Sequence, residues 1–213
     1  MARNVGVYRS LQSVSGVGLT IFALACAERG SGIFGNLADE QDREWFYRIL
    51  ELAWDVPVGE ADENELVEVV EEFQERAESL DPDEPDSKDF YALQSAMLAV
   101  NTIAVHLNPS PMRTETSGQT LETLLGDFDF RLSGQRAVIV RSGEAELPVG
   151  RLQQMEQTAQ SATLQAVVTL TDQDRVTREF LDNIREICRP VRDEIAAGTV
   201  SVAELAGWET HST

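Results

Sequence analysis

An apolar pattern with the period of an α-helix recurs through most of this chain and constrains its fold more than any other feature. The pattern is clearest in the stripe Leu66, Val69, Val70, Phe73, Ala77 and Leu80. Its spacings of three, one, three, four and three residues place every apolar side chain on one side of a helix. Asp62 precedes this segment and Glu65 follows Asp62 by three residues, which is typical of a capping box. The sequence therefore predicts a helix beginning after Asp62.

Similar segments predict helices elsewhere in the chain, and glycine or proline residues are expected to end them. Gly30-Ser31-Gly32 is expected to end the first long helix, and Gly198 the last one, which Thr171 and Asp174 should cap. The further predicted ranges are about 19–29, 39–56, 88–107, 121–125, 149–170 and 172–198. A length of 213 residues suits one domain. We expect residues 1–213 to form a single all-α domain, a bundle of about seven helices.

The segment 88–107 is apolar on almost every side, so it is predicted to be the central and most buried helix. The core of the bundle is predicted to contain the following side chains: Trp54, Phe73, Leu93, Met97, Val100 and Ile184.

Two segments between the helices are predicted to have other structures. Residues 109–118 are rich in Pro, Ser, Thr and Gly, which is typical of a linker. Residues 127–132 alternate acidic or basic residues with apolar ones, and 137–140 are β-branched or small, with Ser133-Gly134 between them. This pattern predicts a small β-ribbon inserted near 127–147.

The net charge limits the kinds of partner. The chain has 37 acidic and 17 basic residues, for a formal charge of −20, and residues 39–89 hold 20 of the acids but only 4 bases. Phosphate groups are bound by clustered Lys and Arg, so direct nucleic-acid binding and polybasic membrane binding are disfavoured. A surface this acidic would favour association with a basic protein.

The predicted third helix carries much of that charge on the sides opposite its apolar stripe. We expect a partner-binding surface, with this set of acids: Glu68, Glu71, Glu72, Glu75, Glu78, Asp81 and Asp83. Simple solubility is the alternative explanation for such a surface. The functional hypothesis is a non-enzymatic interaction protein, in its sharpest form an immunity-type antagonist that covers a basic, nuclease-like partner.

Catalytic patterns are sparse. The chain has two histidines: His106 is expected in the last turn of the central helix and His211 is close to the last residue. We therefore predict no catalytic residue and no cofactor. One alternative stays open, because Glu71, Glu72 and Glu75 resemble half of the magnesium motif of all-α nucleotide pyrophosphohydrolases. In this alternative Glu71, Glu72, Glu75 and Asp81 would hold a metal for phosphate hydrolysis.

The cysteines and the first apolar segment bear on location. Cys26 and Cys188 lie far apart within apolar helical patterns, so buried free thiols in a reducing compartment are expected. The segment 17–26 resembles a targeting signal, with Arg3 and Arg9 before it and a small residue on either side of Leu24. Its helical period continues into Glu28-Arg29, as in a core helix. We expect a cytoplasmic protein, with secretion or lipid anchoring as the alternative.

Four segments recur in the order and rough spacing of a known family. They are residues 22–29 (FALACAER), residues 52–54 (LAW), the acidic loop 82–84 (PDE) and residues 91–96 (YALQSA). The chain thereby resembles the uncharacterised bacterial family catalogued as domain of unknown function 416, best over residues 10–108. It departs from the family pattern at Gly30-Ser31-Gly32 and over 127–148. The resemblance implies an all-helical cytosolic fold, no established activity and no catalytic residue.

Overall fold

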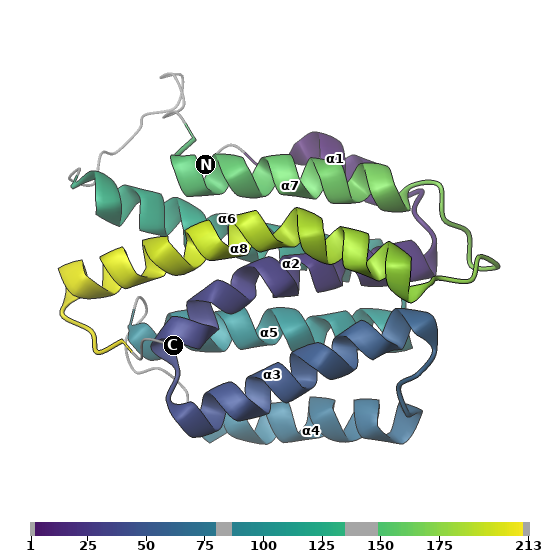
Figure 1. Ribbon diagram of the computed structural model, residues 1–213, viewed down its shortest axis with the longest axis horizontal. Coiled ribbons are helices and arrows are strands. Elements are labelled where there is room, and N and C mark those ends of the chain that lie inside the picture. Colours follow the sequence, from purple (N-terminus) through teal and green to yellow (C-terminus); the bar gives the residue numbers. More distant parts are fainter. Residues whose placement is uncertain (1–2, 80–86, 135–148, 211–213) are drawn as a thin grey trace.

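The computed structural model describes residues 3–79, 87–134 and 149–210, and all the regular structure in them is helical. The helices are α1 (Val5–Leu11), α2 (Gly16–Leu37), α3 (Glu40–Asp55), the short 3-10 helix η1 (Val56–Val58), α4 (Glu63–Ser79), α5 (Lys88–Leu107), α6 (Pro111–Ser133), α7 (Arg151–Val167) and α8 (Arg178–Ala206). The predicted all-α architecture is confirmed. Figure 1 shows α3 and α4 at one edge of the bundle and α1 and α7 at the opposite edge.

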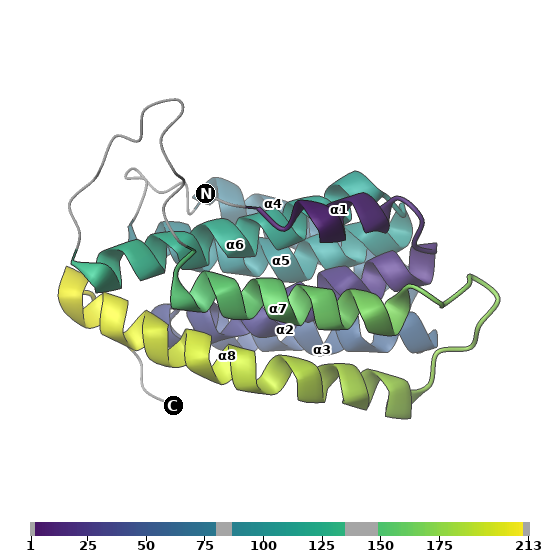
Figure 2. The same ribbon diagram turned by 90° about the horizontal axis from the view of Figure 1, so that it is seen from above.

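Helix α2 is the centre of the bundle, so the prediction that residues 88–107 would be central is wrong. It packs against α3, α5, α6, α7 and α8, and Figure 2 shows it enclosed by other helices. Its side chains from Gly18 to Gly35 are all buried. Helix α5 has an exposed side that includes Met97, which is 38% exposed and therefore not a core residue.

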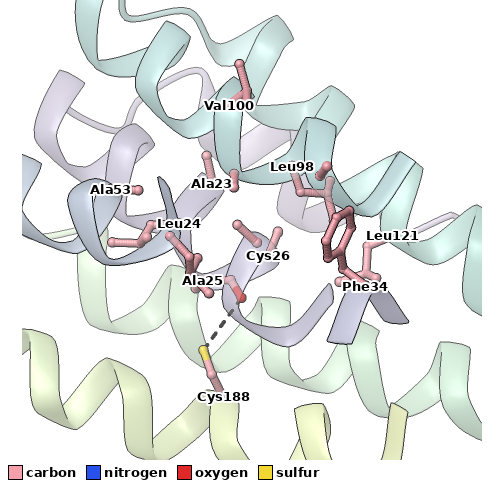
Figure 3. Packing of buried hydrophobic residues seen from close by; sticks show 14 of the residues in the cluster. Ala23, Leu24, Ala25, Cys26, Phe34, Ala53, Leu98, Val100, Leu121 and Cys188 are labelled. Carbon is pink, nitrogen blue, oxygen red and sulfur yellow. Dashed lines mark hydrogen bonds between the residues drawn. The ribbon is translucent and has the colours of Figure 1, made fainter. Parts of the chain in front are cut away.

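The other predicted core residues divide into two groups. Trp54, Val100 and Ile184 are buried as predicted, whereas Phe73 and Leu93 are only partly buried. Both partly buried residues lie near the edge formed by α3 and α4. The densest packing surrounds α2, where Ala23, Leu24 and Leu98 meet in Figure 3.

Gly30-Ser31-Gly32 lies inside α2 and does not end it. A Cβ on Gly32 would lie 2.7 Å from the carbonyl oxygen of Arg192, so a larger side chain would push α8 away. A Cβ on Gly30 would lie 2.6 Å from a Leu98 methyl group of α5. These glycines allow close contact between helices, which explains why α2 continues to Leu37 despite their low helix propensity.

The linker predicted over 109–118 is wrong. Ser110 caps α6 by accepting a hydrogen bond from the Arg113 amide, and Pro111 occupies the first turn, where its missing N–H costs nothing. Thr114 and Ser117 are buried against neighbouring helices. Small polar residues serve here as a helix interface, a use that composition alone did not indicate.

The β-ribbon is also wrong over 127–134, which continues α6 and ends at Gly134 with a left-handed backbone (φ 63°). Phe128 is fully buried, and Asp129 accepts hydrogen bonds from the backbone amides of Leu152 and Gln153 at the start of α7. The alternation therefore reflects helix contacts. The remainder of the predicted ribbon, 135–147, lies outside the described residues.

The last helix also extends beyond its predicted end. Gly198 is buried inside α8, which continues to Ala206 and ends at Gly207 (φ 71°). Thr177 caps it, while Asp174 instead accepts hydrogen bonds from the amide and hydroxyl of Thr171 in the preceding turn.

Two helices among the described residues, α2 and α5, are long and apolar enough to cross a membrane. This is weak evidence, because core helices and signal sequences share these properties, and 94% of the apolar stretch of α2 is buried inside the bundle.

Candidate functional site: the acidic face of α4

Helix α4 is attached to the bundle along its predicted apolar stripe. Asp62 accepts hydrogen bonds from the amides of Asn64 and Glu65, so the predicted N-cap is confirmed. Leu66 and Val69 are buried, and the Phe73 ring lies parallel to that of Trp45 on α3, with centroids 6.3 Å apart. The remaining sides of α4 are left for charged residues.

We define the acidic face as Glu68, Glu71, Glu72, Glu75 and Glu78. With 3.6 residues per turn, these positions lie on one continuous side of α4, opposite Leu66 and Val69. Glu68, Glu71 and Glu75 are exposed. The side chain of Glu78, and Asp81 and Asp83 altogether, lie outside the described residues.

Glu72 differs from its neighbours because two arginines contact it. Arg48 of α3 donates to one carboxylate oxygen at 2.9 Å, and Arg76 lies 3.3 Å from the other. Arg76 also bonds Asp42 at 3.0 Å and covers the Trp45 ring at 4.7 Å. These contacts tie α4 to α3, so Glu72 has a structural role that the sequence did not reveal.

A shallow hollow of about 350 Å³ lies beside the acidic face, between α3 and the start of α4. Glu65, Glu68 and Glu72 line it together with Arg48. The structure therefore brings several predicted partner-binding acids to one concave surface.

The acids of the alternative metal site are not brought together in the described residues. Glu71 and Glu75 point outward from one helix, and Glu72 is bonded to two arginines. No group of three or more His, Cys, Asp or Glu side chains in the described ranges could hold a metal ion. Asp81 lies outside these ranges.

His106 occupies the last turn of α5, as predicted. Burial lowers its pKa, and the Glu63 carboxylate on α4 partly opposes that effect. His211 lies outside the described residues.

Both cysteines are free and buried, as predicted. Burial raises the pKa of Cys188 to about 11 and also raises that of Cys26 well above the usual range, so neither is a thiolate near neutral pH. Cys188 donates a hydrogen bond to the Ala25 carbonyl at 3.6 Å (Figure 3).

The largest feature that the sequence analysis missed is a buried ion pair. The Arg29 guanidinium on α2 donates from Nε and Nη2 to the two carboxylate oxygens of Glu156 on α7, at 2.6 and 2.7 Å, and both side chains are fully buried. Burial alone would lower the pKa of Arg29, but the Glu156 carboxylate raises it well above its usual value.

A second buried acid lies beside it. Glu28 accepts hydrogen bonds from Trp54 Nε1 at 2.9 Å and from Arg192 at 2.8 Å. The available signal was the charged pair Glu28-Arg29 inside an apolar segment, because charges in such a segment require partners.

Comparisons with protein-family models, with curated proteins and with solved structures find no match for this chain. The resemblance to domain of unknown function 416 therefore stays a prediction.

Proposed function

We propose that this protein is a non-enzymatic interaction protein whose acidic face on α4 binds a basic protein partner. The observation that carries the proposal is the grouping of exposed carboxylates, Glu68, Glu71 and Glu75, on one side of a helix at the edge of the bundle (Figure 1). Side chains three and four residues apart on a helix are only about 5–6 Å apart, so these like charges repel one another.

A cationic partner would relieve that repulsion. The two arginines near the acidic face both contact Glu72, which leaves the outer glutamates as the charges that such a partner would meet. Complementary charge also steers diffusional encounter and raises the association rate, an effect that salt screens.

The sharper form of the proposal is an immunity-type antagonist that covers the basic surface of a nuclease. Nucleic-acid-binding surfaces are cationic, so an acidic helix can occupy the region where phosphates would bind. Asp81 and Asp83, which follow α4 in the chain, would extend the surface. This form assumes a cytoplasmic location and needs no cofactor.

A pull-down followed by kinetics tests the proposal. The wild type, the triple variant Glu68→Lys, Glu71→Lys, Glu75→Lys, and a control variant serve as baits in lysate of the native cells. The control reverses three exposed acids of the C-terminal region, Asp182, Glu204 and Glu209, and so makes the same change in net charge. A basic partner should be captured by the wild type and the control but not by the triple α4 variant. Equal capture by all three baits would contradict the proposal.

The competing function, carboxylate-dependent phosphate hydrolysis, rests on the spacing of Glu71, Glu72 and Glu75. It would require Glu72 to leave Arg48 and Arg76 and to turn toward a metal together with Asp81. Calorimetry with Mg²⁺ and Mn²⁺, and a nucleotide-hydrolysis screen, separate the two functions. Metal binding and turnover that Glu72→Gln abolishes would favour the enzyme, whereas the interaction protein requires neither.

A further inference from the structure

A small apolar cavity lies behind the acidic face, between α2, α3, α4 and α5. Its volume is about 170 Å³, and Phe34, Trp45, Phe73, Ala92 and Ala96 are among the residues that line it. An engineered protein cavity of about 150 Å³ is large enough to bind benzene. This cavity therefore has room for one ring or a short branched chain.

Trp45 places an unpaired hydrogen-bond donor at this cavity. Its side chain is about nine-tenths buried, and its Nε1 is, within the described residues, the one buried side-chain nitrogen or oxygen without a hydrogen-bond partner. Trp54 on the same helix donates its own Nε1–H to Glu28. A buried donor left without an acceptor costs about 1–3 kcal/mol, so an orphaned N–H is rare and calls for an explanation.

We propose that the cavity binds a small neutral molecule, with an apolar body of one ring or one branched chain and a carbonyl oxygen that accepts the Trp45 Nε1–H. The aromatic and alanine walls would contact the apolar body, and the carbonyl would satisfy the indole. A few placed polar groups in an otherwise apolar pocket are typical of small-molecule sites.

The charges at the rim favour a neutral ligand over an anion. Asp39, Asp42 and Asp89 line the cavity together with Arg76 and Lys88. Arg76 is already bonded to Asp42 and Glu72, so its charge is largely compensated. A carboxylate ligand would enter beside three acids within the most acidic part of the chain.

The indole N–H signals in a proton–nitrogen NMR spectrum give a direct test on the full chain. The probes are benzamide, which has a ring and a neutral carbonyl, toluene, which lacks the acceptor, and benzoate, which is the anionic analogue. Benzamide should bind with a Kd of about 1 mM, as expected for a fragment of this size, and shift the Trp45 indole signal downfield. The Trp54 signal is the internal control and should stay in place, since its N–H is already bonded to Glu28.

Two variants complete the test. Trp45→Phe should weaken benzamide binding about 10-fold or more while toluene binding changes less. Ala92→Leu should abolish binding of both probes by filling the cavity, with the Trp54 signal and the melting temperature reporting that the fold is kept.

Equal affinities of the wild type for benzamide and toluene, tighter binding of benzoate, or a Trp45 signal that does not move at saturating benzamide would overturn the proposal. Each of these results comes from the wild type, so the proposal stays testable even if a variant fails to fold. The outcome is independent of whether the acidic face binds a protein.

Discussion

The buried ion pair of Arg29 and Glu156 and the acidic face of α4 handle charge in opposite ways. In the interior, each charged group is fully buried and held by a two-point hydrogen-bonded partner. On α4, Glu68, Glu71 and Glu75 face solvent beside one another. Charge in the interior must be paired because desolvation is costly, whereas water tolerates an imbalance at the surface. Interior charge therefore specifies how the helices pack, and only surface charge is available to a partner.

The comparison predicts its largest effect for Arg29→Met. This change leaves the Glu156 carboxylate buried without its partner, and breaking a buried pair in this way costs about 3–5 kcal/mol of the free energy of unfolding. The control is Arg48→Met, which breaks an exposed pair with Glu72 and should cost at most about 1 kcal/mol. Urea denaturation of both variants measures the difference, and equal losses would contradict the distinction between the two regions.

Removing both buried charges should cost less than removing one. The double variant Arg29→Met, Glu156→Met leaves no unpaired charge, so it should recover at least half of the stability lost by Arg29→Met alone. The same urea experiment tests this. A double variant as unstable as the sum of its single changes would mean that the two side chains are not energetically coupled.

The two tryptophans of α3 sharpen the comparison on a smaller scale. Trp54→Phe removes the donor to buried Glu28, while Trp45→Phe removes an N–H that has no acceptor. Since both changes lose a similar apolar area, Trp54→Phe should destabilise the protein by about 1–2 kcal/mol more than Trp45→Phe does. A larger loss for Trp45→Phe would show that its N–H is bonded in solution.

The sequence predicted features that depend on local periodicity and failed where distant contacts decide. The apolar stripe of α4 and its Asp62 cap were predictable because neighbouring residues determine both. The glycines at 30 and 32 were misinterpreted, since their role depends on α5 and α8, which lie far away in the sequence. The alternation over 127–132 was misinterpreted for a related reason, because Asp129 caps the start of another helix.

The candidate surface was only partly predictable. Which acids lie on the outer side of α4 follows from helical spacing, but the contacts of Glu72 with Arg48 and Arg76 depend on how α3 packs beside it. The unpaired N–H of Trp45 has no signature in the sequence, because it depends on where acceptors are missing in three dimensions.

His106 lies between the two extremes, since it is partly buried and near the α4 residue Glu63. Its pKa is lower in the folded chain than in the unfolded chain, so the unfolded chain binds the proton first as the pH falls. The stability from neutral His106 is therefore present above about pH 6.5 and is lost as the pH falls below that value. The urea midpoint should drop less from pH 7.5 to 5.5 in His106→Gln than in the wild type. An identical drop would contradict the shift.

The smallest effect on stability is expected at the acidic face itself. The triple variant Glu68→Lys, Glu71→Lys, Glu75→Lys relieves like-charge repulsion without exposing any apolar group, so its free energy of unfolding should change by less than about 1 kcal/mol. A loss of several kcal/mol, measured by urea denaturation, would mean that these glutamates stabilise the bundle.

The association rate constant of the captured basic partner, measured between 50 and 500 mM salt, tests the central claim most directly. The account predicts that the wild type and the Asp182, Glu204, Glu209 control associate rapidly, with rates that fall steeply as salt rises. The triple α4 variant should associate at least 10-fold more slowly at low salt, with little dependence on salt. Equal rates and equal salt dependence for all three proteins would show that the acidic face of α4 is only a solvated surface.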